Sequence, residues 1–206
     1  MKKISLFGSL LLLILFVGSC SNTKLLTAWK APNEPVPSFK KVLVIAMMTD
    51  RDRKLRENVE NVMVAKLNAA GINAGSALAE YGPKVFDGKD ESATLKAIED
   101  KGYDGTFTIA LLDKSKGKVY NPGMITHRPV RFWGYYRSVF ARVYQPGYYS
   151  TSTKFILEAN FYNLNPDKLL YSAQTRTIDP SSPLALANAF SDKLFNDMRK
   201  QGVISR

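Results

Sequence analysis

Residues 41–48 read Lys-Val-Leu-Val-Ile-Ala-Met-Met, a continuous apolar run rich in Val and Ile. This pattern is typical of a β-strand that is buried on both faces of a sheet. Apolar side chains at helical spacing then run from Leu55 to Ala70 and predict a long helix, which Gly71 ends as a glycine after a helix C-terminus does. The stretch therefore predicts a strand followed by a helix that packs back onto it.

The alternation of strand and helix continues to residue 112. Residues 72–77 predict a short strand, and residues 91–101 predict a second helix. Residues 106–112 (Thr-Phe-Thr-Ile-Ala-Leu-Leu) predict a third buried strand. Right-handed crossovers fold such a β-α-β-α-β order into a layered sheet with helices packed on it.

The second half of the chain predicts antiparallel strands and a C-terminal helix. Residues 154–162 alternate between apolar and polar side chains, as a half-buried strand does. Residues 163–168 (Asn-Leu-Asn-Pro-Asp-Lys) have turn chemistry, so residues 169–178 are the expected hairpin partner. Ser182 and Pro183 suit the N-cap and first position of the last helix. We therefore predict an α+β fold, a single domain with a mixed sheet and helices packed on it.

The first twenty residues have the pattern of a signal peptide. Lys2 and Lys3 precede an apolar stretch, residues 6–17, and Val17-Gly18-Ser19-Cys20 resembles a bacterial lipobox. In that motif a diacylglyceryl group is attached to the cysteine sulfur, and cleavage leaves Cys20 as the acylated N-terminus. An ordinary secretory signal and a single membrane anchor are the alternatives, but the apolar stretch is shorter than the roughly 20 residues that span a bilayer.

This pattern predicts the domain organisation and the location. Residues 1–19 are the expected lipoprotein signal peptide, residues 20–38 a lipid-anchored tether that contains several prolines, and residues 39–206 the α/β lipoprotein domain. Within that domain, residues 114–152 form a long basic and aromatic insertion. No Asp follows Cys20 directly, which in lipoproteins of this kind indicates the outer membrane, and we expect its periplasmic side.

Charge and cysteine content narrow the possible partners. The chain has a formal net charge of +11 and a single cysteine, so neither a disulfide framework nor a site of several thiolates can form within it. A basic domain often binds nucleic acid, but that partner is scarce in the periplasm. Anionic lipid headgroups, lipopolysaccharide phosphates and acidic glycans are the expected alternatives, and no nucleic acid is expected.

Three stretches resemble known envelope proteins. Residues 41–72 and the segment Asp100-Lys101-Gly102-Tyr103-Asp104-Gly105 resemble the α/β domain of the curli-secretion lipoprotein, of the outer-membrane activator of penicillin-binding proteins and of the amino-terminal domain of TolB. Residues 163–173 resemble a hairpin of small periplasmic lipoproteins. The resemblance implies roles in assembly and binding, and it names no catalytic residue.

Residues 114–157 contain no Asp or Glu, and Arg and Lys alternate there with aromatic residues. Arginine forms bidentate hydrogen bonds to phosphate or carboxylate, and Tyr, Trp and Arg dominate binding hot spots. A connection of this length without regular structure is often functional. The alternative is that the aromatic residues cover a sheet face or form a mobile flap. The predicted binding residues are Arg128, Arg131, Trp133, Tyr135, Tyr136, Arg137 and Arg142.

The sequence offers little support for catalysis. His127 is the single histidine, and the acidic pairs, such as Asp50 and Asp52, sit at expected helix starts or turns. No nucleotide-binding glycine loop is present. We therefore predict a non-enzymatic protein with no cofactor and no metal, whose partner is an envelope protein. A binder of acidic envelope glycan or lipopolysaccharide is the alternative, a hydrolase that uses acids around Asp50 ranks last, and the oligomeric state stays open.

Overall fold

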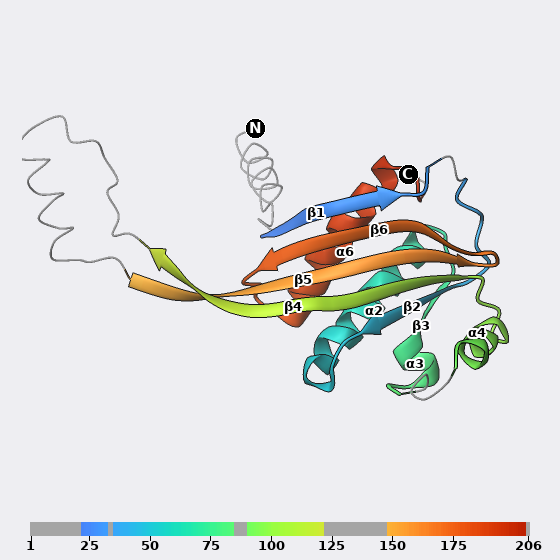
Figure 1. Cartoon of the computed structure of the whole chain (residues 1–206), viewed down its shortest axis with the longest axis horizontal. Helices are drawn as coiled ribbons and strands as arrows, with labels where there is room; N and C mark the ends of the chain where they lie inside the picture. Colours follow the sequence, from blue (N-terminus) through green and yellow to red (C-terminus); the bar gives the residue numbers. More distant parts are fainter. Residues whose placement is uncertain (1–21, 33–34, 85–89, 122–147, 205–206) are drawn as a thin grey trace, which may run out of the picture.

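A six-stranded mixed sheet organises the protein (Figure 1). The computed structural model describes residues 22–32, 35–84, 90–121 and 148–204. In chain order, the elements are β1 (Thr23–Lys30), β2 (Val42–Met47), the 3₁₀ helix η2 (Asp50–Asp52), α2 (Arg53–Ala69), β3 (Ala74–Ser76), α3 (Ala77–Tyr81), α4 (Glu91–Glu99), β4 (Gly105–Asn121), β5 (Tyr148–Leu164), β6 (Asp167–Ile178) and α6 (Pro183–Lys200).

The strand order combines a parallel half with an antiparallel half. The order across the sheet is β1-β6-β5-β4-β2-β3. β2 pairs in parallel with both β3 and β4, whereas the pairs β4–β5, β5–β6 and β6–β1 are antiparallel. This arrangement confirms the predicted α+β class, with β-α-β-α-β first and antiparallel strands and a C-terminal helix after it.

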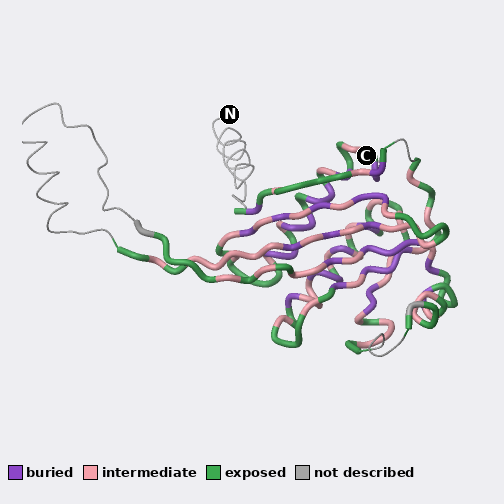
Figure 2. Tube along the Cα trace, viewed as in Figure 1, coloured by how far each residue is buried: buried purple, intermediate pink, exposed green. Residues whose placement is uncertain are grey.

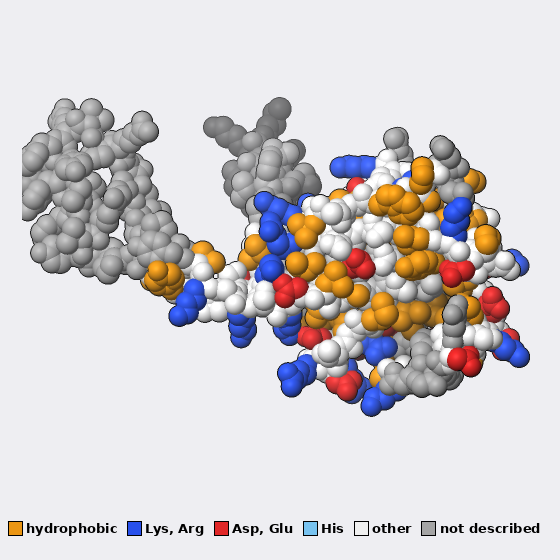
Figure 3. All heavy atoms as spheres, in the orientation of Figure 1, with side chains coloured by type: hydrophobic (Ala, Val, Ile, Leu, Met, Phe, Trp, Pro, Cys, Tyr) orange, Lys and Arg blue, Asp and Glu red, His pale blue; other side chains and the backbone are white. Residues whose placement is uncertain are grey.

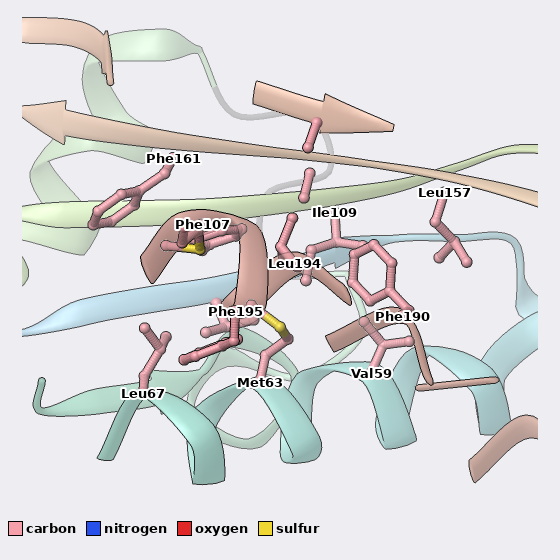
Figure 4. Close-up of a cluster of buried hydrophobic side chains, with 14 of the residues drawn as sticks. Val59, Met63, Leu67, Phe107, Ile109, Leu157, Phe161, Phe190, Leu194 and Phe195 are labelled. Carbon is pink, nitrogen blue, oxygen red and sulfur yellow. The ribbon is translucent and has the colours of Figure 1, made fainter. Parts of the chain in front are cut away.

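The main core lies between the sheet and the two long helices, α2 and α6 (Figure 4). Met63 of α2, Phe190 of α6 and Phe107 of β4 are completely buried in it. Helical spacing places the apolar residues of each helix on one stripe, which is why both helices can face the same layer. Full burial of one such large apolar side chain stabilises the fold by about 1.5–3 kcal/mol.

The opposite face of the sheet is covered over a smaller area. Leu43 of β2 points to this face because its neighbours Val42 and Val44 point into the main core. It packs in a second cluster with Ala77 of α3 and with Ile98 of α4. Among the described elements, no helix covers β4, β5 and β6 on this side (Figure 1). The face of the antiparallel half is therefore open in the described part of the chain.

Local signals in the sequence explain the helix boundaries. Gly71 has a φ of 81°, in the left-handed region that glycine adopts most easily, and it follows Ala70, the C-cap residue of α2. The Ser182 Oγ accepts a hydrogen bond from the Ala185 backbone N–H at 3.0 Å, with Pro183 at the first position of α6. Both predicted signals are confirmed.

Two segments that are predicted as a tether and an insertion contain strands in the structure. The predicted tether, residues 20–38, includes β1, which pairs antiparallel with β6 from Thr23 opposite Thr177 to Lys30 opposite Tyr171. β1 is an edge strand whose side chains are mostly exposed, so it lacks the regular apolar alternation that reveals a strand. The predicted insertion, residues 114–152, is also not irregular throughout, because β4 extends to Asn121 and β5 begins at Tyr148.

Candidate functional site

β4 and β5 project beyond the rest of the sheet as a two-stranded ribbon (Figure 1). β2 ends at Met47, opposite Ala110 of β4, and β6 ends at Ile178, opposite Lys154 of β5. Beyond these points β4 and β5 pair only with each other, as far as Asn121 opposite Tyr148. We call residues 114–121 and 148–153 the arm. Its outer six residue pairs span about 20 Å at the usual rise of a strand.

Asp179 fixes the root of the arm. Its carboxylate accepts hydrogen bonds from the Thr153 backbone N–H at 2.6 Å and from the Ser152 Oγ at 2.9 Å, and its own N–H donates to the Thr153 carbonyl at 2.9 Å. Asp179 adopts a φ of 47°, a region in which Asp is tolerated better than most residues. On the other strand, a bulge between Leu111 and Asp113 adds twist where β4 leaves the body.

Two lysines at the root of the arm form ion pairs with acidic residues. Lys114 Nζ lies 2.6 Å from Asp52 Oδ1, and Lys154 Nζ lies 2.8 Å from Asp113 Oδ2. The hydrogen bond from Lys154 is the main cause that lowers the pKa of the Asp113 carboxyl below its usual value. The charges of these two lysines are therefore compensated within the molecule.

The outer part of the arm presents uncompensated positive charge and apolar surface. Lys116 and Lys118 are exposed and form no ion pair with any described residue. Val119, Tyr148 and Tyr149 are 47%, 68% and 69% exposed. Figure 2 shows exposed residues along both strands where the arm leaves the body, and Figure 3 shows basic side chains along it. Such a surface can bind anionic groups and can stack on flat or apolar ones.

The predicted binding residues lie between the two strands of the arm in the sequence. Arg128, Arg131, Trp133, Tyr135, Tyr136, Arg137 and Arg142 all fall outside the described residues, as do Cys20 and His127. The chain leaves the described part at Asn121 and re-enters it at Tyr148, which are paired at the tip of the arm. The assignment of these residues to binding stays a prediction.

The sequence did not reveal a buried carboxylate, Glu60 of α2, which is fully buried. It accepts hydrogen bonds from the Ala46 backbone N–H at 3.0 Å and the Leu78 backbone N–H at 2.8 Å, and also from the Ser76 hydroxyl. Arg56 Nε lies 3.5 Å from its Oε1. The helical spacing of Glu60 to Val59 and Met63 places it on the buried side, but its hydrogen-bond donors come from other segments, so no local pattern could identify them.

A second carboxylate, Glu80 of α3, collects donors at the β3 edge of the sheet. The Tyr103 hydroxyl donates to it, and Lys41 Nζ and Lys101 Nζ lie 3.2 Å and 3.4 Å from its oxygens. Burial favours a higher pKa for Glu80, but the hydrogen bonds from Tyr103 and Lys41 outweigh it, so the pKa is lowered. For Tyr103, burial and the hydrogen bond to Glu80 both raise the pKa.

The described residues contain no cluster of three or more His, Cys, Asp or Glu side chains that could hold a metal ion. Asp52, one of the acids near Asp50, is paired with Lys114 and accepts a hydrogen bond from the Thr49 hydroxyl at 3.2 Å. In the same part of the chain, no helix is both long enough and apolar enough to cross a membrane.

Several solved protein structures are similar to this one. No protein-family model and no curated protein matches the sequence. The PelC dodecamer from Paraburkholderia phytofirmans is similar at a TM-score of 0.47 and 11% identity, over 84% of this chain and 94% of that one. Lipoprotein GNA1162 from Neisseria meningitidis is similar at a TM-score of 0.44 and 13% identity, over 78% and 98%.

A minor lipoprotein from Acinetobacter baumannii is similar at a TM-score of 0.26 and 9% identity, over 77% of this chain and 94% of that one. Proteins described as lipoproteins are thus among the structures that this chain resembles. The finer resemblance to the curli-secretion lipoprotein, the activator of penicillin-binding proteins and TolB stays a prediction.

Proposed function

We propose that this chain is a non-enzymatic lipoprotein that acts in binding or assembly at the periplasmic face of the outer membrane. The observation that carries the proposal is the arm, a ribbon with exposed lysines and tyrosines outside the body of the fold. A two-stranded ribbon without a covering layer is marginally stable in water. Its side chains contribute little to the main core, so a contact with another molecule accounts for them better than stability does.

The position of the chain start relative to the arm supports the proposal. Thr23 is the first residue of β1 and follows Cys20 by three residues, which span about 10 Å when extended. The Ile178 backbone N–H donates to the Asn22 carbonyl at 3.3 Å, so the start of β1 lies beside the end of β6. From there to the root of the arm on β5 is two strand spacings, about 10 Å. A lipid on Cys20 would therefore hold the root of the arm close to the membrane surface.

A second candidate function is binding of an acidic envelope polymer, such as lipopolysaccharide or an acidic glycan. Lys116 and Lys118 favour it because they are exposed, have no described acidic partner and lie at the same end as the chain start. Binding that rests on such exposed charges weakens as the salt concentration rises. A protein partner held by the tyrosines of the arm would depend less on salt.

The test is capture of the lipidated protein from crosslinked cells. The arm variant carries Lys116→Ser, Lys118→Ser and Tyr148→Ser, and the control carries Lys96→Ser, Lys193→Ser and Leu184→Ser at exposed helix positions. We expect a partner that the unchanged protein and the control retain and that the arm variant loses. Loss of salt-sensitive binding to purified lipopolysaccharide in the arm variant alone would favour the second candidate. Equal recovery from both variants would refute a role for the arm.

A further inference from the structure

A pocket of about 690 Å³ opens at the carboxyl end of β2, the end of the sheet from which the parallel strand β4 continues into the arm. From β2 the chain passes through α2 to β3, the neighbour of β2 on one side in the sheet. It then passes through α3 and α4 to β4, the neighbour of β2 on the other side. The two connections pack on opposite faces of the sheet. In open α/β sheets, ligands bind outside the carboxyl ends of the strands where the connections diverge in this way. The volume is in the range of small-molecule sites.

Arg56 of α2 lies in the wall of this pocket, and its side chain is 16% exposed. Nη1 donates to the Pro83 carbonyl at 3.1 Å, and Nε faces Glu60 at 3.5 Å without forming a hydrogen bond of good geometry. A guanidinium has five N–H donors, and Arg56 forms no other hydrogen bond with any described residue. Of these donors only Nε is a buried atom without a hydrogen bond, and it faces Glu60, so an incoming oxyanion would be met by the Nη groups, which have the Pro83 carbonyl as their one described acceptor.

Glu60 holds the Arg56 guanidinium in place. Its carboxylate is fixed by the Ala46 and Leu78 backbone N–H groups and the Ser76 hydroxyl, which belong to three different segments. Because Glu60 compensates the charge of Arg56, attraction by net charge is small at this point. Selectivity would come from the planar fork of the guanidinium, which matches the geometry of a carboxylate or phosphate.

The remaining wall combines hydroxyl groups and apolar side chains with one acidic and one basic residue, Asp50 and Lys84. Thr94 of α4 and Thr108 of β4 line the pocket, as do Ile45, Met47 and Met48 at the end of β2. Met47 is 53% exposed, which is a high value for a large apolar side chain at the end of a central strand. A ligand with an apolar part would cover it.

We propose that this pocket binds a small organic anion. Its carboxylate or phosphate group is held by Arg56, the Thr108 hydroxyl is available to it in the wall of the same pocket, and its apolar part lies against Met47 and Met48. No residue of the arm lines the pocket, and the proposed site does not depend on the function proposed for the arm.

The test is titration of the purified mature protein with sodium benzoate, sodium acetate and inorganic phosphate, at constant ionic strength set with chloride. We expect a saturable rise in the thermal unfolding midpoint with benzoate or phosphate, and calorimetry to give one site. Saturation by benzoate alone identifies a carboxylate ligand with an apolar part, and saturation by phosphate alone identifies a phosphate ligand. If acetate raises the unfolding midpoint as strongly as benzoate does, the proposed contact between the ligand and Met47 and Met48 is wrong.

Three variants locate the site. Arg56→Lys keeps the charge opposite Glu60 but removes the fork, and binding should weaken by about tenfold. Thr108→Val leaves the Arg56–Glu60 pair intact and should weaken binding severalfold, which keeps the test valid if Arg56→Lys does not fold. Arg53→Lys changes an exposed arginine of the same helix and should leave binding unchanged. No saturable response to any probe, or equal affinity in all three variants, would overturn the proposal.

Discussion

Replacement of Glu60 by Ala tests how strongly this buried carboxylate holds the parallel half of the sheet together. The substitution leaves two backbone N–H groups, those of Ala46 and Leu78, and the Ser76 hydroxyl without their acceptor. It also leaves Arg56 without its counter-charge. Removal of one partner from a buried ion pair costs about 3–5 kcal/mol of unfolding free energy. Arg56 lies at the pocket wall and can turn towards water, so we expect a loss at the lower end, about 3 kcal/mol.

The matched control is Glu57→Ala, one turn earlier on the same helix. Glu57 pairs with Lys54 at 3.1 Å, but both side chains are well exposed, at 45% and 71%. Exposed pairs of this kind contribute at most about 1 kcal/mol. The two variants therefore remove the same chemical group from a buried site and from an exposed site.

The assay is urea unfolding followed by circular dichroism. With a denaturant dependence of about 2 kcal/mol per molar urea, the loss for Glu60→Ala corresponds to a midpoint lower by roughly 1.5 M. The midpoint for Glu57→Ala should fall by less than about 0.5 M on the same scale. If the two variants unfold within 1 kcal/mol of each other, a figure within the usual spread of surface substitutions, the inferred role of Glu60 is wrong.

Two further predictions concern the Glu80 cluster. A Cβ on Gly75 would collide with the Tyr103 hydroxyl and approach Glu80 Oε1 to 2.7 Å. Because Tyr103 is only 2% exposed, Gly75→Ala should lower the unfolding free energy by about 1–3 kcal/mol in the same assay. An unfolding free energy equal to that of the unchanged protein would show that Tyr103 moves without cost. The pKa of Glu80 in the folded protein is below the ordinary glutamate value of 4.5. The ionised carboxylate therefore stabilises the fold above pH 4.5, and this contribution is lost as the pH falls through the folded pKa. The unchanged protein should therefore be more stable than Glu80→Gln at pH 7, with a gap that narrows below pH 4.5, and a gap that stays constant with pH would contradict this reasoning.

Much of the fold was predictable because its signals are local. The apolar run of β2, the stripe of α2 and the Ser182–Pro183 start of α6 each depend on residues within one element. β1 was missed because an edge strand needs no apolar alternation when its pairing partner, β6, supplies the hydrogen bonds. The five-residue helix α3 is too short for a periodic pattern to identify.

The candidate sites depend more strongly than the helices and strands on contacts between segments that are far apart in the sequence. The composition of residues 114–157 indicated a basic and aromatic surface, but not that its two ends form a paired ribbon, because Lys and Ser outside a core carry little strand signal. The pocket beside Arg56 could not be predicted from local sequence at all. Its wall brings together β2, α2 and the segment that follows α3, and only the fold places Pro83 next to Arg56.

The proposed function requires that the arm contacts another molecule in the cell envelope. The most direct measurement is photo-crosslinking in living cells from a photoreactive amino acid at position 148, compared with the same group at position 184. Tyr148 of the arm and Leu184 of α6 are both exposed, at 68% and 50%. We expect a discrete crosslinked product from position 148 that is absent from position 184. No product from position 148, or the same products from both positions, would contradict it.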